Sequence, residues 1–405
     1  MQTHVIVGAG LAGAKAAQTL RDEGFDGRVV LVGSESDRPY ERPPLSKDYL
    51  RGESGRDAAY AHAAGYYDEH DIELRTETTV ARVDLGAEEV ELEGGERIGY
   101  DRLLLTPGAE PRRLPVPGAD LDGVLYLRVF GDSDAIRERI EAGGPAVVIG
   151  AGWIGAEVAA SARTKGLDVT LIEREDVPLT TSLGRELGEI YGAIHRDHGV
   201  DLITGAQVEA LEGDGRVERV RLAGGRTIDC AFAVVGVGVA PRIGLAEAAG
   251  LACDNGILTD ELLRTSAREV FAAGDAANAV HPFYGHRVRV EHWHNALEQG
   301  PAAARSMLGD GKPYDVIPYF FSDQYEVGME YAGYAREWEE VVFRGDVEAR
   351  EFIAFWLHGN RVVAGMNVNV WDVTDGIQAL IRSRKTVDPA QLRDPDVPIE
   401  CLASR

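Results

Sequence analysis

Two glycine patterns of the same form constrain the fold of this chain more than any other feature. The first is Gly8-Ala-Gly10-Leu-Ala-Gly13, which follows an apolar run at residues 5–7 and precedes a helix-like stretch at residues 14–21. This order of strand, glycine turn and helix is typical of a dinucleotide cradle. The first glycine permits a tight turn, the second lets a pyrophosphate approach the backbone amides, and the third lets helix and strand pack closely.

A second strand and an acid complete the first pattern. The run Arg-Val-Val-Leu-Val at residues 28–32 predicts the strand, and Glu35 follows it. An acid at this point accepts hydrogen bonds from a ribose diol. A lone glycine pattern is weak support for a nucleotide site, whereas the pattern with both strands and the acid is much stronger.

The same order recurs at residues 146–155, which read Ala-Val-Val-Ile-Gly150-Ala-Gly152-Trp-Ile-Gly155. A helix is expected to run through residue 163, followed by a strand at residues 168–172 that ends at Glu173. Glu173 suits the free 2′-hydroxyl of NADH and would repel the 2′-phosphate of NADPH. Arg174 is a complication, because a neighbouring arginine can pair with that phosphate. We favour NADH.

Two such cradles on one chain indicate two dinucleotides. The economical interpretation is one flavin dinucleotide, FAD, and one nicotinamide dinucleotide, with hydride passing between them. The predicted fold class is therefore α/β, with two Rossmann-like dinucleotide-binding domains, for FAD and NADH, and a C-terminal α+β domain.

Further segments are expected to close the flavin site. The run Leu-Leu-Leu-Thr-Pro-Gly-Ala at residues 103–109 predicts a short strand and a turn, and residues 111–118 predict a stiff connector. Downstream, Glu-Val-Phe-Ala-Ala-Gly274-Asp275 predicts another buried strand that ends in Gly-Asp. Asp275 could bond a sugar hydroxyl, or it could be the N-cap of the next helix; the spacing does not separate these interpretations.

The segment Pro-Tyr-Glu-Arg-Pro-Pro-Leu-Ser-Lys at residues 39–47 holds a lysine behind three prolines. Each proline fixes φ near −65° and restricts the residue before it, so Lys47 follows a stiff segment. Taken alone, the segment could be an ordinary proline-rich surface loop.

These residues together resemble a known family, the FAD-dependent pyridine nucleotide reductases, which share two glycine motifs and a later Gly-Asp. Residues 38–47, the stretch Glu291-His-Trp293-His-Asn-Ala and the stretch Phe-Ser-Asp-Gln-Tyr at residues 321–325 narrow the match. They resemble the putidaredoxin reductase-like ferredoxin reductases that serve cytochrome P450 and ring-hydroxylating dioxygenase systems. The similarity covers essentially the whole chain.

The resemblance implies roles near the flavin. Arg42 would contact the cofactor, and Lys47 would sit near the reacting edge of the isoalloxazine, where a fixed cation stabilises negative charge. Glu157 would pair with Lys47 where the nicotinamide docks. Trp293 matches an aromatic beside the flavin, although it could also be a large core residue. Lys47, Glu157 and Trp293 are thus the expected catalytic group.

The expected cofactor contacts form a larger set. For FAD and NADH together they are Gly8, Gly10, Leu11, Ala12, Gly13, Glu35, Arg42, Lys47, Val80, Thr106, Gly108, Arg128, Gly150, Gly152, Trp153, Ile154, Gly155, Glu157, Glu173, Gly236, Gly274, Asp275, Glu291, His292 and Trp293.

Composition limits the partners. The chain has 405 residues and a formal net charge of −25, which disfavours nucleic acid and anionic membranes. The N-terminus shows no basic leader or long apolar run, so we expect a cytoplasmic protein. Cys230, Cys253 and Cys401 have neither CxxC nor metal-like spacing; we expect two buried structural thiols, a tail cysteine and no metal site. Related disulfide and peroxide reductases use cysteines beside the flavin, and residues 36–60 contain none.

After about residue 315 the sequence changes to short aromatic-rich segments, which predict antiparallel strands and a helix at residues 374–382. The expected domains are 1–110 and 239–314 for FAD, 111–238 for NADH and 315–405 for the C-terminal α+β domain. Tyr319 and Phe321 are often tryptophan in relatives, a departure that bears on the electron path to the partner.

The leading hypothesis is an NADH-dependent ferredoxin reductase whose partner is a [2Fe–2S] ferredoxin. An acidic ferredoxin would need a basic patch, for which residues 286–289 and 382–385 are candidates; scattered surface charge is the alternative. Other acceptors, rubredoxin or a quinone-like molecule, fit the same fold. An apoptosis-inducing-factor-like redox sensor is an alternative from another class.

Overall fold

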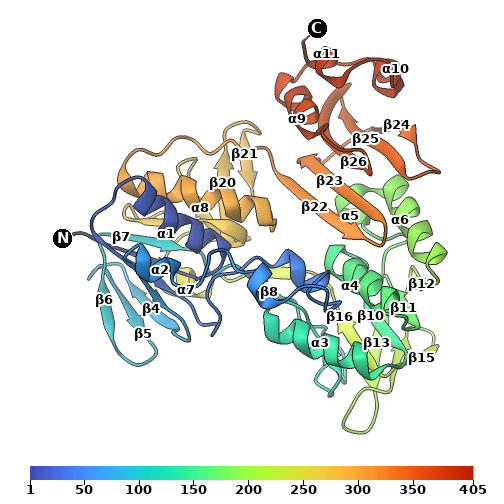
Figure 1. The fold of residues 1–405 in the computed structure, drawn as a ribbon, viewed down its shortest axis with the longest axis horizontal. Coiled ribbons are helices and arrows are strands. Elements are labelled where there is room, and N and C mark those ends of the chain that lie inside the picture. The colour runs from blue at the N-terminus through green and yellow to red at the C-terminus, as the bar shows by residue number, and fades with distance from the viewer. Residues whose placement is uncertain (405) are drawn as a thin grey trace. The chain divides into compact units, whose positions relative to one another are not determined.

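The computed structural model describes residues 1–404 (Figure 1). The chain forms two compact units, each assembled from three separate segments. Unit 1 contains residues 1–41, 59–110 and 240–320, and unit 2 contains residues 42–58, 111–239 and the chain from residue 321 onward. The chain passes between the units after residues 41 and 58, and again within β8 (Ala109–Pro111), β17 (Val239–Pro241) and β22 (Tyr319–Gln324).

Unit 1 is built on a parallel sheet with the strand order β19-β7-β1-β2-β3. Its strands are β1 (Thr3–Val7), β2 (Arg28–Val32), β3 (Ile72–Arg75), β7 (Arg102–Leu105) and β19 (Val270–Ala272). Alternate residues of β1 serve different clusters, because Val5 packs in one apolar cluster and Ile6 in another. Both faces of the sheet are therefore covered, which explains the unbroken apolar runs.

Two helices run beside each other in unit 1, α1 (Leu11–Asp22) and α8 (Trp293–Leu308), as Figure 1 shows. Gly300 of α8 permits this close packing, because a Cβ there would lie 2.3 Å from the carbonyl oxygen of Ala12. Unit 1 also contains α2 (Tyr66–Glu69), β4 (Val80–Asp84), β5 (Glu89–Leu92), β6 (Arg97–Gly99), α7 (Gly244–Ala248), β18 (Ile257–Thr259), the 3-10 turn η3 (Gly274–Ala276), β20 (Ala277–His281) and β21 (His286–Val288).

Unit 2 holds a second parallel sheet, with the order β12-β11-β10-β16-β9. Its strands are β9 (Val124–Leu125), β10 (Ala146–Ile149), β11 (Val169–Ile172), β12 (Asp201–Ile203) and β16 (Phe232–Val235). Every residue of β10 is buried. The first two segments of unit 2 also contain the 3-10 turns η1 (Pro43–Ser46) and η2 (Arg56–Ala58), α3 (Phe130–Ala142), α4 (Trp153–Thr164), α5 (Thr180–Leu183), α6 (Arg185–Asp197), β13 (Val208–Glu212), β14 (Arg219–Leu222) and β15 (Thr227–Asp229).

The end of the chain adds a sheet of order β22-β23-β26-β25-β24 to unit 2. The pairs β23–β26, β24–β25 and β25–β26 are antiparallel. Its further elements are β23 (Val327–Gly333), β24 (Glu340–Asp346), β25 (Glu351–His358), β26 (Arg361–Val368), α9 (Thr374–Ser383), α10 (Pro389–Arg393) and α11 (Ile399–Ser404). The buried Trp356 Nε1 donates to the carbonyl oxygen of Leu183, 3.1 Å away, so this sheet packs on the α5 region.

The predicted fold class is confirmed: two parallel sheets carry the two glycine patterns, and an antiparallel sheet with helices follows. The helix predicted at residues 374–382 is α9. Cys230 is buried as expected and Cys401 is exposed, whereas Cys253 is only half-buried. None of the described helices has the length and apolar character that a membrane crossing requires.

Candidate functional site

The first glycine turn joins β1 to α1 in unit 1. Gly8 has φ +116°, and a Cβ there would lie 2.0 Å from the carbonyl oxygen of Thr106, so a side chain does not fit. The Thr106 hydroxyl donates to the Gly8 carbonyl oxygen at 2.8 Å. Gly13 packs equally close, with the Gly8 oxygen 2.1 Å from its ideal Cβ position. These contacts confirm the tight turn and the close helix packing predicted from the pattern.

Glu35 lies beyond β2, at the edge of this turn. Its carboxylate accepts a hydrogen bond from the Tyr40 hydroxyl. Tyr40, within the proline-rich segment, was not among the predicted site residues. The one sequence feature that could have indicated this contact is its position five residues after Glu35. The structure thus places Glu35 at the carboxyl end of the sheet, where the sequence predicted it.

The Gly274-Asp275 segment closes over the start of α1. A Cβ on Gly274 would lie 3.2 Å from Ala12 Cβ, and the Gly274 amide donates to the buried Gln299 Oε1 at 2.9 Å. Sequence reasoning missed Gln299, which lies far away on α8. The N-cap interpretation of Asp275 is wrong: Asp275 lies inside η3, whose N-cap is Ala273, because the chain turns here into β20 instead of entering a helix.

The residues 291–293 lie at the start of α8, where His292 is the N-cap. Loss of solvent lowers the pKa of His292 to about 4, so its imidazole is neutral at pH 7. Arg289 forms an ion pair with Glu291 and also donates to the Asp275 carbonyl oxygen at 3.2 Å. Arg287 donates to the carbonyl oxygens of Thr259 and Asn278, so the arginines of this candidate basic patch bind groups within unit 1.

Other predicted contacts are dispersed. In unit 1, Val80 begins β4, and Gly108 accepts a backbone hydrogen bond from Arg242 at 2.9 Å. In unit 2, the Arg42 guanidinium donates to the Arg128 carbonyl oxygen at 2.5 Å, so these two predicted residues do meet.

The second glycine turn joins β10 to α4 in unit 2. Gly150 has φ +97°, and its ideal Cβ position lies 2.4 Å from the carbonyl oxygen of Gly236. Gly155 packs on Gly150 as Gly13 packs on Gly8, with 1.9 Å between its ideal Cβ position and the Gly150 oxygen. Ile154, the residue before Gly155, is 43% exposed. The backbone of the turn is therefore tightly packed at Gly150 and Gly155, whereas the start of α4 is accessible to solvent at Ile154.

Glu173 directly follows β11 and lies beside this turn. Its Oε2 accepts from the Ala151 amide at 2.6 Å, and its Oε1 accepts from the Glu175 amide at 3.0 Å. The exposed Arg174 pairs with Glu175, with 3.1 Å between Nη2 and Oε1. The acid is thus fixed at the cradle's edge, while the arginine is partly neutralised by its neighbour.

A buried ion pair lies on the flank of α4. Lys47 Nζ is 2.7 Å from Glu157 Oε2, which confirms the expected pairing. The two prolines of η1 occupy its first turn, and Lys47 is its C-cap, as a stiff segment requires. Two hydroxyls also reach the carboxylate: Ser46 Oγ donates to Oε2 at 2.5 Å, and Ser322 Oγ donates to Oε1 at 2.7 Å.

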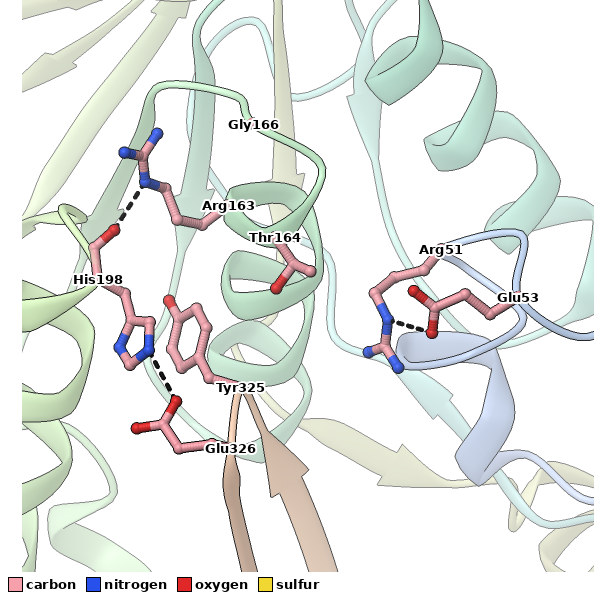
Figure 2. Close-up of a pocket in the computed structure, with 8 residues that line it drawn as sticks. All are labelled: Arg51, Glu53, Arg163, Thr164, Gly166, His198, Tyr325 and Glu326. Carbon is pink, nitrogen blue, oxygen red and sulfur yellow. Dashed lines mark hydrogen bonds and ion pairs between the residues drawn. The ribbon is translucent and has the colours of Figure 1, made fainter. Parts of the chain in front are cut away.

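Unit 2 also has an open polar cleft of about 700 Å³, distinct from the predicted site residues (Figure 2). Figure 2 shows Tyr325 and Glu326, at the tip of the β22–β23 hairpin, against His198. The Tyr325 and His198 rings stack 3.7 Å apart, and His198 Nε2 lies 2.8 Å from Glu326 Oε2. These contacts anchor the hairpin tip.

Both turns fit a dinucleotide. At Gly10 and Gly152 no heavy atom of the described residues, chain neighbours apart, lies within 4 Å of the ideal Cβ position. Each of these glycines begins a helix as its N-cap, where unpaired amides attract an anion. The space that a side chain would fill is thus where a pyrophosphate can approach.

The fold and these two turns define a class of oxidoreductase with two dinucleotide sites. The sequence matches the family described as pyridine nucleotide-disulphide oxidoreductase over residues 2–300, and the reductase C-terminal family over residues 319–403. The chain belongs to the pyridine nucleotide-disulphide oxidoreductase family.

Similar proteins narrow the resemblance. The chain is 38% identical over 402 residues to rhodocoxin reductase from Rhodococcus erythropolis, covering 99% of this chain and 94% of that protein. It superposes with a TM-score of 0.96 on the ferredoxin reductase for the CYP199A2 system from Rhodopseudomonas palustris, which is 34% identical, with 100% of both chains covered. The putidaredoxin reductase in a covalent complex with putidaredoxin gives a TM-score of 0.95 at 35% identity, with 100% and 98% covered.

Proposed function

We propose that this protein is an NADH-dependent ferredoxin reductase that holds FAD and passes electrons singly to a [2Fe–2S] ferredoxin of a cytochrome P450 or ring-hydroxylating oxygenase system. The observation that carries the proposal is the presence on one chain of two dinucleotide turns with different surroundings. The similarity to a ferredoxin reductase of the CYP199A2 system supports the choice of acceptor.

The two turns are assigned to different dinucleotides according to how deeply each is buried by other segments of its unit. In unit 1 the start of α1 is buried, with Ala12 6% exposed beneath the Gly274 segment. In unit 2 the start of α4 is open, with Ile154 43% exposed. A covered turn suits a cofactor that stays bound, and an open turn suits a substrate that exchanges in every cycle. We therefore assign FAD to the first turn and NADH to the second.

The preference for NADH is assigned to Glu173. Its carboxylate is held by two backbone amides at the turn, where it can accept hydrogen bonds from the adenosine ribose. A 2′-phosphate there would meet this negative charge. Because Glu175 pairs with Arg174, less of the arginine's charge is available to offset the repulsion.

The Lys47–Glu157 pair is assigned to hydride transfer. FAD, when bound, accepts the two electrons of a hydride and releases them one at a time. The chain's own contribution is placement: η1 holds the lysine, and Glu157 fixes its ammonium. A buried, fixed cation stabilises developing negative charge without reorganising. The role of Trp293 beside the flavin stays a prediction.

We further propose that residues 1–110 and 239–314 form the FAD-binding domain, residues 111–238 the NADH-binding domain and residues 315–405 the C-terminal domain. The cytoplasm is the proposed location. Fractionation of cells that express the protein, with a cytoplasmic and an exported marker enzyme, tests this.

An anaerobic titration tests the function. NADH should bleach the flavin band at about 450 nm, and a [2Fe–2S] ferredoxin added next should restore it. NADPH at the same concentration should bleach the band much more slowly. Bleaching without recovery on adding ferredoxin would contradict the proposed acceptor, and no bleaching by either nucleotide would contradict the proposed reaction.

A further inference from the structure

The Glu157 carboxylate has more partners than its ion pair with Lys47. Ser46 reaches it from η1, and Ser322 reaches it from β22. Glu157, Lys47 and both serines are buried. A buried carboxylate needs its oxygens satisfied, and each hydrogen bond to the charged group contributes more than a neutral one. The two hydroxyls therefore help to determine where this charge lies.

Each serine is itself held in place. Ser46 is tied to α4, because the Ser161 hydroxyl donates to the Ser46 carbonyl oxygen at 2.7 Å. The Ser133 hydroxyl donates to the neighbouring Leu45 oxygen at 2.8 Å. Ser322 accepts from the buried Gln324 side-chain amide at 3.3 Å, which leaves its own hydrogen for the carboxylate.

The strand that carries Ser322 is also anchored. The hairpin tip that follows β22 rests on His198 through the stacked Tyr325 ring and the hydrogen bond with Glu326 (Figure 2). Arg350 pairs with Glu326 as well, with 2.6 Å between Nη1 and Oε1. Ser322 is thus fixed from the tip of its hairpin, and the third segment of unit 2 supplies a donor to Glu157 in the second segment.

We propose that Ser46 and Ser322 are positioning residues of the NADH site, which hold Glu157, and through it Lys47, against the nicotinamide half of the bound nucleotide. The proposal rests on the proposed function. Glu173 and the glycine turn take the adenosine ribose and the pyrophosphate. The half of NADH that remains to meet the flank of α4 carries the nicotinamide.

Two ligands separate this role from a structural one. NAD⁺ contains both halves of the dinucleotide, and ADP-ribose lacks the nicotinamide. In the FAD-loaded protein, Ser322→Ala should raise the Kd for NAD⁺ about tenfold and leave the Kd for ADP-ribose within about twofold. Isothermal titration calorimetry of both ligands measures these changes at equilibrium, without turnover.

Further variants sharpen the result. Ser46→Ala removes the other hydroxyl from a different element and should give the same pattern, so either variant alone tests the proposal. Ser322→Thr keeps the hydroxyl in a residue suited to a strand, so its Kd for NAD⁺ should stay at the wild-type value. Ser306→Ala removes a buried hydroxyl of α8 in unit 1 and should change neither affinity. In a Glu157→Gln background, Ser322→Ala should add less than twofold.

Two results would overturn the proposal. One is an unchanged affinity for NAD⁺ in either serine variant, which would remove that serine's positioning role. The other is an equal loss for NAD⁺ and ADP-ribose, which would make the serines structural supports of unit 2. Failure of the proposed function would give a different result from failure of the serine proposal. The wild-type protein would then bind neither NAD⁺ nor ADP-ribose, or it would bind them normally and fail to reduce ferredoxin.

Discussion

The two glycine turns of this protein share a backbone and differ in what surrounds it. In both, the first glycine is pressed on a backbone carbonyl and the second faces open space. The start of α1 is buried beneath the Gly274 segment and α8, whereas Ile154 at the start of α4 is 43% exposed. The same anion-binding device can therefore serve a retained cofactor or an exchanging substrate, depending on later segments of the chain.

The helices differ at one equivalent position. The residue two after the third glycine is Lys15 in α1 and Glu157 in α4. Lys15 is only half-buried and donates to Gln18 on its own helix at 3.1 Å. Glu157 is buried with three donors. The second helix thus places a buried, charged Glu157–Lys47 pair near its glycine turn. Such a pair suits the site where the proposed hydride transfer from NADH takes place.

The largest expected effect comes from filling either turn. Gly10 and Gly152 have extended backbones that any residue adopts, so valine at either position adds bulk without backbone strain. Gly10→Val should yield protein without FAD, and Gly152→Val should yield yellow protein whose reduction by NADH falls at least about 100-fold. The absorption spectrum and stopped-flow bleaching measure both. Gly131→Ala, in open space on α3, is the control. Loss of FAD from the Gly152 variant would reverse the assignment.

Lysine replacement compares the two helices more directly. Lys47→Ala should slow flavin reduction by about 10- to 100-fold while FAD stays bound, because the fixed cation is lost. Lys15→Ala, a half-buried lysine near the first turn, should leave the rate of reduction within about twofold. Stopped-flow rates at saturating NADH measure both variants. An unchanged rate in the Lys47 variant would remove this residue from the mechanism.

Charge at the second turn should set the nucleotide preference. Glu173→Ala should reduce discrimination against NADPH by about tenfold, since the repulsion of the 2′-phosphate is removed. The measurement is the ratio of kcat/KM for the two nucleotides. Arg174→Ala is the companion variant and should change that ratio much less, given its pairing with Glu175. A ratio that Glu173→Ala leaves unaltered would contradict the assignment.

The smallest expected effect is a change in the free energy of unfolding near neutral pH. Here the two units should respond alike, because each contains a buried histidine. Burial lowers the pKa of His4 in unit 1 and of His195 in unit 2 to about 4, against 6.5 when unfolded. Because the unfolded chain takes up a proton first, stability should fall as pH drops below 6.5 and level off below 4. For His195 the loss is less than about 1 kcal/mol at pH 6 and about 3 kcal/mol near pH 4.

His195→Gln should flatten this pH dependence, and the exposed His358→Gln should not. Thermal unfolding followed between pH 7 and pH 5 measures the difference. Equal pH dependence in wild type and the His195 variant would show that burial of this imidazole carries no proton linkage.

Local patterns predicted much of this fold. The glycine turns, the strands β1, β2, β10 and β11 and the ion pair between Lys47 and Glu157 were all accessible from the sequence, the last through the family resemblance. The signals for the turns and strands are local: apolar runs, fixed glycine spacing and an acid at the end of a strand.

Contacts between distant segments were not predictable. Gln299 reaches Gly274, and Ser322 reaches Glu157, across stretches of chain whose packing no periodicity encodes. The N-cap interpretation of Asp275 failed for the same reason: a Gly-Asp pair after a strand fits several turns, and only the path into β20 decides among them.

The most direct test of the account is the retention of each nucleotide by one sample. Purified protein is loaded with FAD and NAD⁺, passed through a desalting column, and the nucleotides that remain are quantified after denaturation. The covered first turn predicts FAD near one equivalent and almost no NAD⁺. Retention of NAD⁺ with loss of FAD, or equal loss of both, would contradict the assignment of the covered turn to the cofactor and the open turn to the substrate.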